Sequence, residues 1–147
     1  MANSLDKYSK PIKIEDTKLS TIYWLNFRDS KKGRLFIPLF DKRFAKAFQV
    51  KYSYLSKFLE KDNASGNHYH NIKEEILIPL QGSFDILLED IASKEKEVLS
   101  LNGDDNKGIY IRTGISHKVI SKENTGLLLV LASNHSTLED EIEYIVG

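Results

Sequence analysis

The sequence predicts an all-β fold, either a sandwich or a barrel, formed by a single domain. Short runs of β-branched and aromatic residues recur at a spacing of roughly 8–12 residues, with turn residues between them. Only Asp41–Ala47 and Leu138–Tyr144 suit helices, and both are short. The 147 residues, 41% of them hydrophobic, are enough for one core, so residues 1–147 are expected to form one domain.

The first half of the chain contains three expected strands. Residues 1–20 are polar and lysine-rich, which predicts a tail or an edge strand. Pro38 places the second of the three strands at an edge or a bulge, because proline cannot donate to a sheet. Lys61–Gly66 is rich in turn residues and predicts a loop. The expected strands of this half are Thr21–Phe27, Arg34–Leu39 and Phe48–Leu55.

The second half contains six expected strands. Gln81 and Gly82 separate the first two, and this spacing predicts a hairpin that turns on Gly82. The acidic run Glu139–Glu143 is expected to face solvent. The expected strands are Glu75–Leu80, Ser83–Leu88, Val98–Leu101, Gly108–Arg112, His117–Ile120 and Leu127–Leu131.

Composition excludes several classes of protein. The chain has 21 basic and 21 acidic residues, and this balance argues against a nucleic-acid-binding protein, which usually has a basic excess. The longest apolar run, Gly126–Ala132, is too short to cross a membrane. The charged N-terminal segment does not suit a signal peptide, and the absence of cysteine excludes disulfides and zinc–thiolate sites. A cytoplasmic protein with no membrane or nucleic-acid partner is therefore expected.

Three of the four histidines form a pattern with chemical meaning. His68 and His70 are two residues apart, so on a strand both side chains point to one face. Glu75 follows His70 by five residues, and His117 follows Gly114 by three. Two imidazoles on one face can bind one metal ion together, or one can act as a base while the other binds the substrate.

This spacing resembles the motifs of the cupin superfamily. His-x-His, four residues, Glu, six residues and Gly82 match its first motif, and Gly114-x-x-His117 matches part of its second. The resemblance implies an RmlC-like double-stranded β-helix, which is a jelly-roll barrel. The mouth of such a barrel is a natural site for a small molecule.

A narrower resemblance covers residues 25–145. In this region the chain is similar to the dTDP-sugar 3,4-ketoisomerase, or WxcM-like, branch of the cupins. The segments that carry the likeness are Lys32–Leu35, Phe48–Tyr54, Gly66–His70, Leu80–Ser83, Gly108–Ile111, His117 and Val130–Ser133.

The resemblance implies an isomerase that moves a keto group between C4 and C3 of a dTDP-4-keto-6-deoxyhexose. In that family the product is a precursor of surface-glycan sugars, and no cofactor is needed. Members of the family pair through N-terminal strands, so a homodimer is expected. Thr21–Phe27 is the candidate contact, because an exposed apolar edge strand needs a cover.

The resemblance also implies roles for individual residues. His70 is expected to be the base, His68 its partner and Tyr54 the assisting acid. Tyr52 and His117 are expected to bind substrate. Ser65 stands where the family usually has an arginine, and guanidinium groups suit diphosphates. The remaining candidates for that contact are Arg34 and Arg112.

Two other functions are consistent with the same residues. A set of three imidazoles and one carboxylate suits a divalent transition metal, so the protein is alternatively a metal-dependent dioxygenase or isomerase. The metal ligands in that hypothesis are His68, His70, Glu75 and His117. The third hypothesis is a cupin that binds a sugar without chemistry. The single Trp24 is expected to fill the core or an interface.

Overall fold

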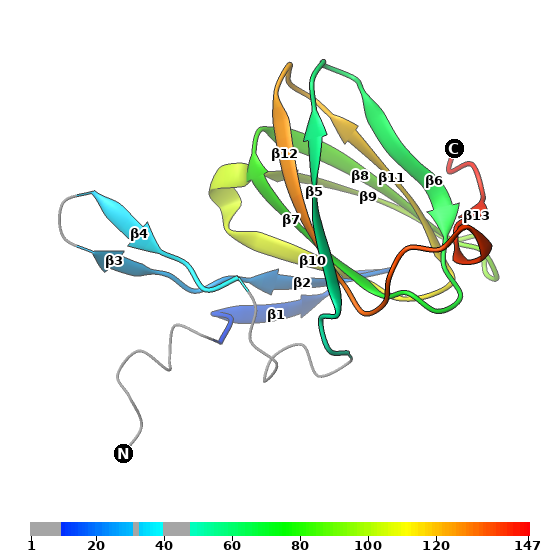
Figure 1. Cartoon of the computed structure of the whole chain (residues 1–147), viewed down its shortest axis with the longest axis horizontal. Coiled ribbons are helices and arrows are strands. Elements are labelled where there is room, and N and C mark those ends of the chain that lie inside the picture. Colours follow the sequence, from blue (N-terminus) through cyan, green and yellow to red (C-terminus); the bar gives the residue numbers. More distant parts are fainter. Residues whose placement is uncertain (1–9, 31–32, 40–47) are drawn as a thin grey trace.

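The protein is described by a computed structural model, which covers residues 10–30, 33–39 and 48–147. Two antiparallel sheets face each other as a sandwich, and a small ribbon of two strands projects from one side (Figure 1). No helix in the described part of the chain is long and apolar enough to span a membrane. The strands are β1 (Lys13–Asp16), β2 (Thr21–Trp24), β3 (Arg28–Ser30), β4 (Arg34–Phe36), β5 (Tyr52–Phe58), β6 (Ala64–Tyr69), β7 (Glu75–Gln81), β8 (Ser83–Asp90), β9 (Lys96–Asn102), β10 (Lys107–Ile111), β11 (Ile115–Ser121), β12 (Gly126–Ala132) and β13 (Ile142–Glu143).

The strand order interleaves distant parts of the sequence, as in a jelly roll. One sheet has the order β1-β2-β10-β7-β12-β5, and the other has the order β13-β6-β11-β8-β9. All pairs are antiparallel, including β5 with β12 and β6 with β11. The projecting ribbon is β3 paired with β4. Two short 3₁₀ segments, Gly103–Asp105 and Leu138–Asp140, complete the described regular structure.

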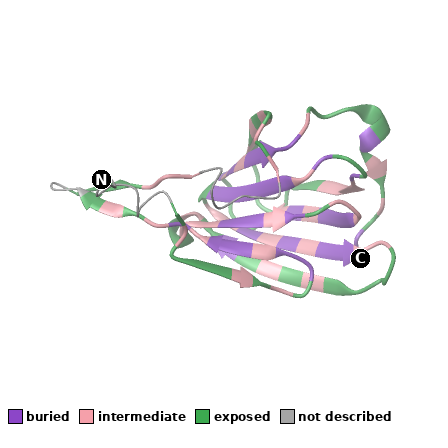
Figure 2. Ribbon diagram, turned by 90° about the horizontal axis from the view of Figure 1, so that it is seen from below, coloured by how far each residue is buried: buried purple, intermediate pink, exposed green. Residues whose placement is uncertain are grey.

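The main core lies between the two sheets. Buried and more exposed residues alternate along several strands (Figure 2), because successive side chains of a strand point to opposite faces. A second cluster covers the outer face of the six-stranded sheet. There, Ile76 and Ile78 of β7 pack beneath Ile37, Leu39 and Phe48. Because β7 is covered on both faces, its residues from Glu75 to Pro79 are all buried. Glu75 is thus a buried carboxylate at the first residue of a strand that is covered on both faces.

The predicted all-β class is confirmed, and most expected strands appear within a few residues of their predicted limits. The hairpin at Gly82 is wrong. Gly82 has φ +85° and turns the chain, but β7 and β8 belong to different sheets. An added Cβ there would lie 2.7 Å from the carbonyl oxygen of Thr125, so glycine allows the chain to cross between sheets at close approach.

Other predictions need correction as well. The expected loop Lys61–Gly66 becomes strand β6 from Ala64 onward. The expected helix Leu138–Tyr144 is a 3₁₀ segment followed by β13, and the expected helix Asp41–Ala47 lies outside the described residues. Within residues 10–20, the predicted edge strand exists as β1.

The strand chosen as the dimer contact is also not an edge. β2 pairs with β1 on one side and with β10 on the other, so its backbone groups are already satisfied within the sheet. The edges of this sheet are β1 and β5, and at β1 Ile12 and Ile14 are 61% and 54% exposed. Trp24 is partly buried against the core, and both Lys13 and Lys107 lie over its ring.

Candidate active site

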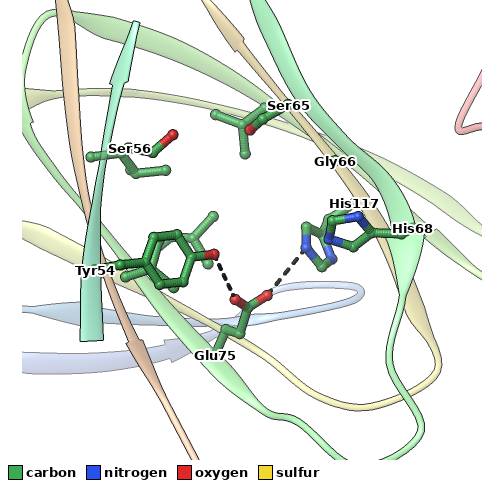
Figure 3. A pocket seen from close by; sticks show the side chains of 11 residues that line it. Tyr54, Ser56, Ser65, Gly66, His68, Glu75 and His117 are labelled. Atoms are coloured by element: carbon green, nitrogen blue, oxygen red, sulfur yellow. Dashed lines mark hydrogen bonds and ion pairs between the residues drawn. The ribbon is translucent and has the colours of Figure 1, made fainter. Parts of the chain in front are cut away.

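A cavity opens between β5 and β6, with β7, β11 and β12 behind it (Figure 3). Its volume is about 430 Å³, counting the open mouth and the solvent in it. The wall is aliphatic in its depth and polar elsewhere. The lining residues are Tyr54, Ser56, Ser65, Gly66, His68, Glu75, Leu77, His117, Val119, Leu128 and Val130.

Strand register brings two of the histidines together. His68 in β6 lies directly opposite His117 in β11, and their ring centroids are 4.9 Å apart. The pairing shifts between His117 and Lys118, where Asn67 of β6 is the extra residue between His68 and Gly66. Gly66 has φ +101°, and an added Cβ would lie 2.3 Å from the carbonyl oxygen of His117. Only glycine therefore permits the close backbone approach that sets both imidazoles at the cavity.

His70 lies just beyond the end of β6 and is buried, with 3% exposure. Its ring centroid is 4.8 Å from that of His68, but His70 does not line the cavity. Its Nδ1 lies 2.7 Å from the carbonyl oxygen of Asp140. A carbonyl oxygen only accepts hydrogen bonds, so this contact requires a proton on Nδ1 and leaves Nε2 facing the site.

Glu75 connects the polar groups of the cavity. Its Oε1 lies 3.2 Å from Nε2 of His117 and 3.4 Å from Nε2 of His70. Its Oε2 accepts a hydrogen bond from the hydroxyl of Tyr54 at 3.2 Å (Figure 3). The carboxylate therefore fixes the orientation of the phenol on β5 relative to the imidazole on β11.

The buried ammonium group of Lys73 lies close to the Glu75 carboxylate, and the sequence analysis did not identify this residue. Lys73 is 2% exposed, and its Nζ lies 3.6 Å from Oε2 of Glu75. The same ammonium donates to the hydroxyl of Ser136 at 2.9 Å. The only sequence signal was a lysine two residues before the glutamate, and that signal does not reveal burial.

Asp140 is the second residue that the sequence analysis missed. It lies in the acidic run that was expected to face solvent, yet it is 6% exposed. Its carboxylate accepts three backbone N–H bonds, from Asn71, Ile72 and Lys73, at 2.8–2.9 Å. These bonds cap the loop that follows His70 and hold it against the C-terminal segment.

The environment sets the protonation states of three groups. Burial alone would raise the pKa of Glu75, but its interactions with His117 and His70 and the charge of Lys73 outweigh burial and hold that pKa well below its ordinary value. Burial, reinforced by the charges of the neighbouring imidazoles, lowers the pKa of His68 to about 4. Burial and the Glu75 carboxylate raise the pKa of Tyr54. Near neutral pH, Glu75 is thus ionised, His68 is a neutral imidazole and Tyr54 is a protonated phenol.

Three of the predicted substrate-binding residues do not line this cavity. Tyr52 lies next to it, between the rings of Tyr54 at 5.7 Å and His135 at 5.2 Å. Arg112 is paired with Asp90 at 2.8 Å. Arg34 is in β4, on the projecting ribbon away from the sandwich (Figure 1). Of the predicted residues, His68, Tyr54, Glu75 and His117 meet at the cavity, and His70 lies directly behind them.

The same residues are compatible with a metal ion. One nitrogen from each of His68, His70 and His117 lies within 4.8 Å of the others. Nε2 of His70 is buried and makes no hydrogen bond within the described part of the chain. Imidazole nitrogens with a neighbouring carboxylate suit a divalent transition metal.

Comparison with known proteins identifies the family. The family described as "FdtA: WxcM-like, C-terminal" matches residues 15–145. The chain belongs to this family. None of the curated proteins matches it.

Solved structures of two similar proteins are sugar ketoisomerases. WlaRA, a TDP-fucose-3,4-ketoisomerase from Campylobacter jejuni, is 27% identical, with a TM-score of 0.73 over 84% of this chain and 87% of that one. QdtA, a sugar 3,4-ketoisomerase from Thermoanaerobacterium thermosaccharolyticum in complex with TDP, is 26% identical, with a TM-score of 0.72 over 85% and 88%. The predicted family is confirmed.

The fold is shared more widely. The dTDP-4-dehydrorhamnose 3,5-epimerase of Bacillus anthracis, with TDP and PPi bound, has a TM-score of 0.80 at 12% identity, over 88% of this chain and 81% of that one. At this identity the likeness concerns the fold alone, and it confirms the predicted RmlC-like cupin jelly roll.

Proposed function

We propose that the protein is a dTDP-sugar 3,4-ketoisomerase, which interconverts a dTDP-4-keto-6-deoxyhexose and its 3-keto isomer. One observation supports this most directly. A neutral imidazole, that of His68, and a protonated phenol, that of Tyr54, face each other across a cavity of about 430 Å³ in a member of the FdtA family. Keto migration needs a base at carbon and a proton donor at oxygen.

We assign the base to His68 rather than to His70. His68 lines the cavity, whereas His70 is buried behind it with Nδ1 engaged by Asp140. The proton on C3 of the substrate is acidic because it lies next to the C4 ketone. In the first step His68 removes that proton, and the C–H electron pair becomes the C3–C4 double bond of an enediol. His68 then returns the proton to C4.

Tyr54 is the group proposed to transfer protons to and from the substrate oxygens. As the C3–C4 double bond forms, the phenol donates a proton to the C4 oxygen. When the C3 carbonyl forms, the C3 hydroxyl returns a proton to the phenolate. One proton has then moved from C3 to C4 and another from the C3 oxygen to the C4 oxygen, so the isomerisation balances with no redox cofactor. Glu75 holds the phenol in place at 3.2 Å.

The remaining polar groups position these two. His117 contacts both Glu75 and the cavity, so we propose that it binds the substrate oxygens. Tyr52 lies next to the cavity, with its ring against that of Tyr54, and we propose that it contacts the nucleotide. Arg112 is already paired with Asp90 and does not line the cavity, so we assign it no contact with the hexose.

We further propose a cytoplasmic homodimer that makes sugar precursors for surface glycans. Ile12 and Ile14 on the β1 edge, together with Leu35 and Phe36 on the ribbon, are between 43% and 61% exposed. A two-stranded ribbon alone is marginally stable in water, so a second copy is a suitable cover. Light scattering after size exclusion tests this: Ile14→Lys on the β1 edge is expected to shift the protein toward monomer, whereas Lys118→Glu on β11 leaves the assembly unchanged.

A metal-dependent reaction is the second candidate, and the unbonded Nε2 of His70 is the observation in its favour. The residues that would hold the ion are His68, His70, Glu75 and His117. A bound divalent ion would act as a Lewis acid on a substrate oxygen. Elemental analysis of untagged protein, with Glu75→Gln in parallel, separates the candidates. Near-stoichiometric metal that is lost in the variant favours the metal-dependent reaction.

The test of the proposed function is product formation. Purified protein is incubated with dTDP-4-keto-6-deoxyglucose in D₂O, and the sugar is followed by NMR. We expect a 3-keto product, with deuterium at C4 only to the extent that the proton on His68 exchanges with solvent before it is returned. We expect no turnover by His68→Asn, with an unchanged circular dichroism spectrum. A wild-type protein that leaves the substrate unchanged would refute the proposal. Full turnover by His68→Asn would refute the assignment of the base.

A further inference from the structure

Two serine hydroxyls at the cavity have no role in the mechanism above. Ser56 of β5 and Ser65 of β6 face each other from opposite sides of the mouth, at the end away from Glu75 (Figure 3). Neither side chain has a hydrogen-bond partner among the described residues. Both hydroxyls are therefore free to bind a ligand that enters between the two strands.

The surroundings of these hydroxyls indicate the kind of group they bind. The cavity wall beside them is formed by Leu77, Val119 and Leu128, all 2% exposed. No lysine or arginine lines the cavity in the described part of the chain. Phosphates are usually held by cations or by clustered N–H groups, whereas serine hydroxyls both donate to and accept from a neutral hydroxyl. A neutral hydroxyl therefore fits this end of the cavity better than a diphosphate.

The hexose of the proposed substrate has one neutral hydroxyl that takes no part in the reaction. In a 4-keto-6-deoxyhexose, C3 and C4 and their oxygens take part in the reaction, and C6 is a methyl group. The hexose hydroxyl that remains is the one on C2, next to the C3 atom that faces His68. We propose that Ser56 and Ser65 recognise the C2 hydroxyl. This inference rests on the proposed ketoisomerase activity.

The test removes each serine hydroxyl from the protein and the C2 hydroxyl from the substrate, separately and together. Turnover of dTDP-4-keto-6-deoxyglucose and of its 2-deoxy counterpart is measured for the wild type, Ser56→Ala and Ser65→Ala. We expect each variant to lose about tenfold in kcat/KM, mainly through KM, with the first substrate, and to match the wild type with the 2-deoxy substrate. Ser53→Ala is the matched control, because Ser53 lies on β5 but is exposed on the opposite face, and it is expected to change neither.

Three results would overturn the inference. Equal losses on both substrates would show that the serines do not recognise the C2 hydroxyl. So would unchanged kinetics on both. Weaker inhibition by dTDP in the variants would assign the serines to the diphosphate. Wild-type protein that converts neither sugar would instead refute the proposed function, and this inference with it. Thermal unfolding of each variant separates loss of binding from loss of fold.

Discussion

Replacing Lys73 with methionine is expected to lower the free energy of unfolding by about 3–5 kcal/mol, the usual effect of removing one partner of a buried ion pair. Both partners are enclosed, since Lys73 and Glu75 are each 2% exposed. At 3.6 Å and an effective dielectric constant of about 20, the attraction is roughly 5 kcal/mol. The variant also loses the hydrogen bond to Ser136. It leaves the Glu75 carboxylate buried without its ammonium partner.

Urea denaturation followed by Trp24 fluorescence measures this change. The matched variants are Glu75→Gln, which leaves the ammonium unpaired, and Lys73→Met/Glu75→Gln, which leaves no charge in the pair. If the pair is coupled as the structure indicates, the double variant is more stable than the sum of the single losses by at least about 2 kcal/mol. Additive losses, or a loss below about 1 kcal/mol in Lys73→Met, would refute the reasoning.

Three further predictions follow from the site. Tyr54→Phe is expected to lower kcat by about 10²–10⁴-fold, because it removes the proton donor but keeps the ring; stopped-time assays check this, and unchanged kcat would contradict the role. The folded state holds the pKa of His68 near 4, below the ordinary 6.5, so the unfolded chain binds more protons between these values. Stability should therefore fall as pH drops from about 6.5 to about 4, and pH-dependent urea titrations of wild type and His68→Asn should differ in that window. Gly66→Ala should lower the free energy of unfolding by at least about 2 kcal/mol, because the added Cβ meets the carbonyl oxygen of His117. Gly33→Ala should lower it by about 1–2 kcal/mol, because Gly33 also has positive φ but has nothing within 4 Å of the added Cβ. Equal losses of the two variants in thermal unfolding would contradict the steric argument.

Local sequence signals predicted the strands well but not how the strands combine. Glu75–Leu80 was placed within one residue of β7, because an apolar run ends at a glycine turn. The same turn was interpreted as a hairpin, since a sequence shows where a chain turns but not which sheet the next strand joins. Pairings such as β2 with β10 depend on contacts across the whole chain.

The site was predictable where the sequence spacing encodes a shared face. His68 was found from the His-x-His spacing, whereas Glu75 and His117 came from the resemblance to the cupin motifs, and strand register places His117 opposite His68. Lys73 and Asp140 were missed because their burial depends on partners far along the chain, and the two are 67 residues apart. The relative roles of His68 and His70 also depend on which ring reaches the cavity, and two residues of spacing do not determine that.

The pairing of β5 with β12 has a consequence for how quickly the protein folds. Tyr52 lies opposite Ala132, and all seven residue pairs of this ladder join segments that are far apart in the sequence, with most of the other strands between them. Closing such long loops costs entropy before any contact compensates for it. Folding in the range of milliseconds to seconds is therefore expected, as for other domains dominated by non-local strand pairing. Since β5 supplies Tyr54, the site is complete only once this ladder has formed.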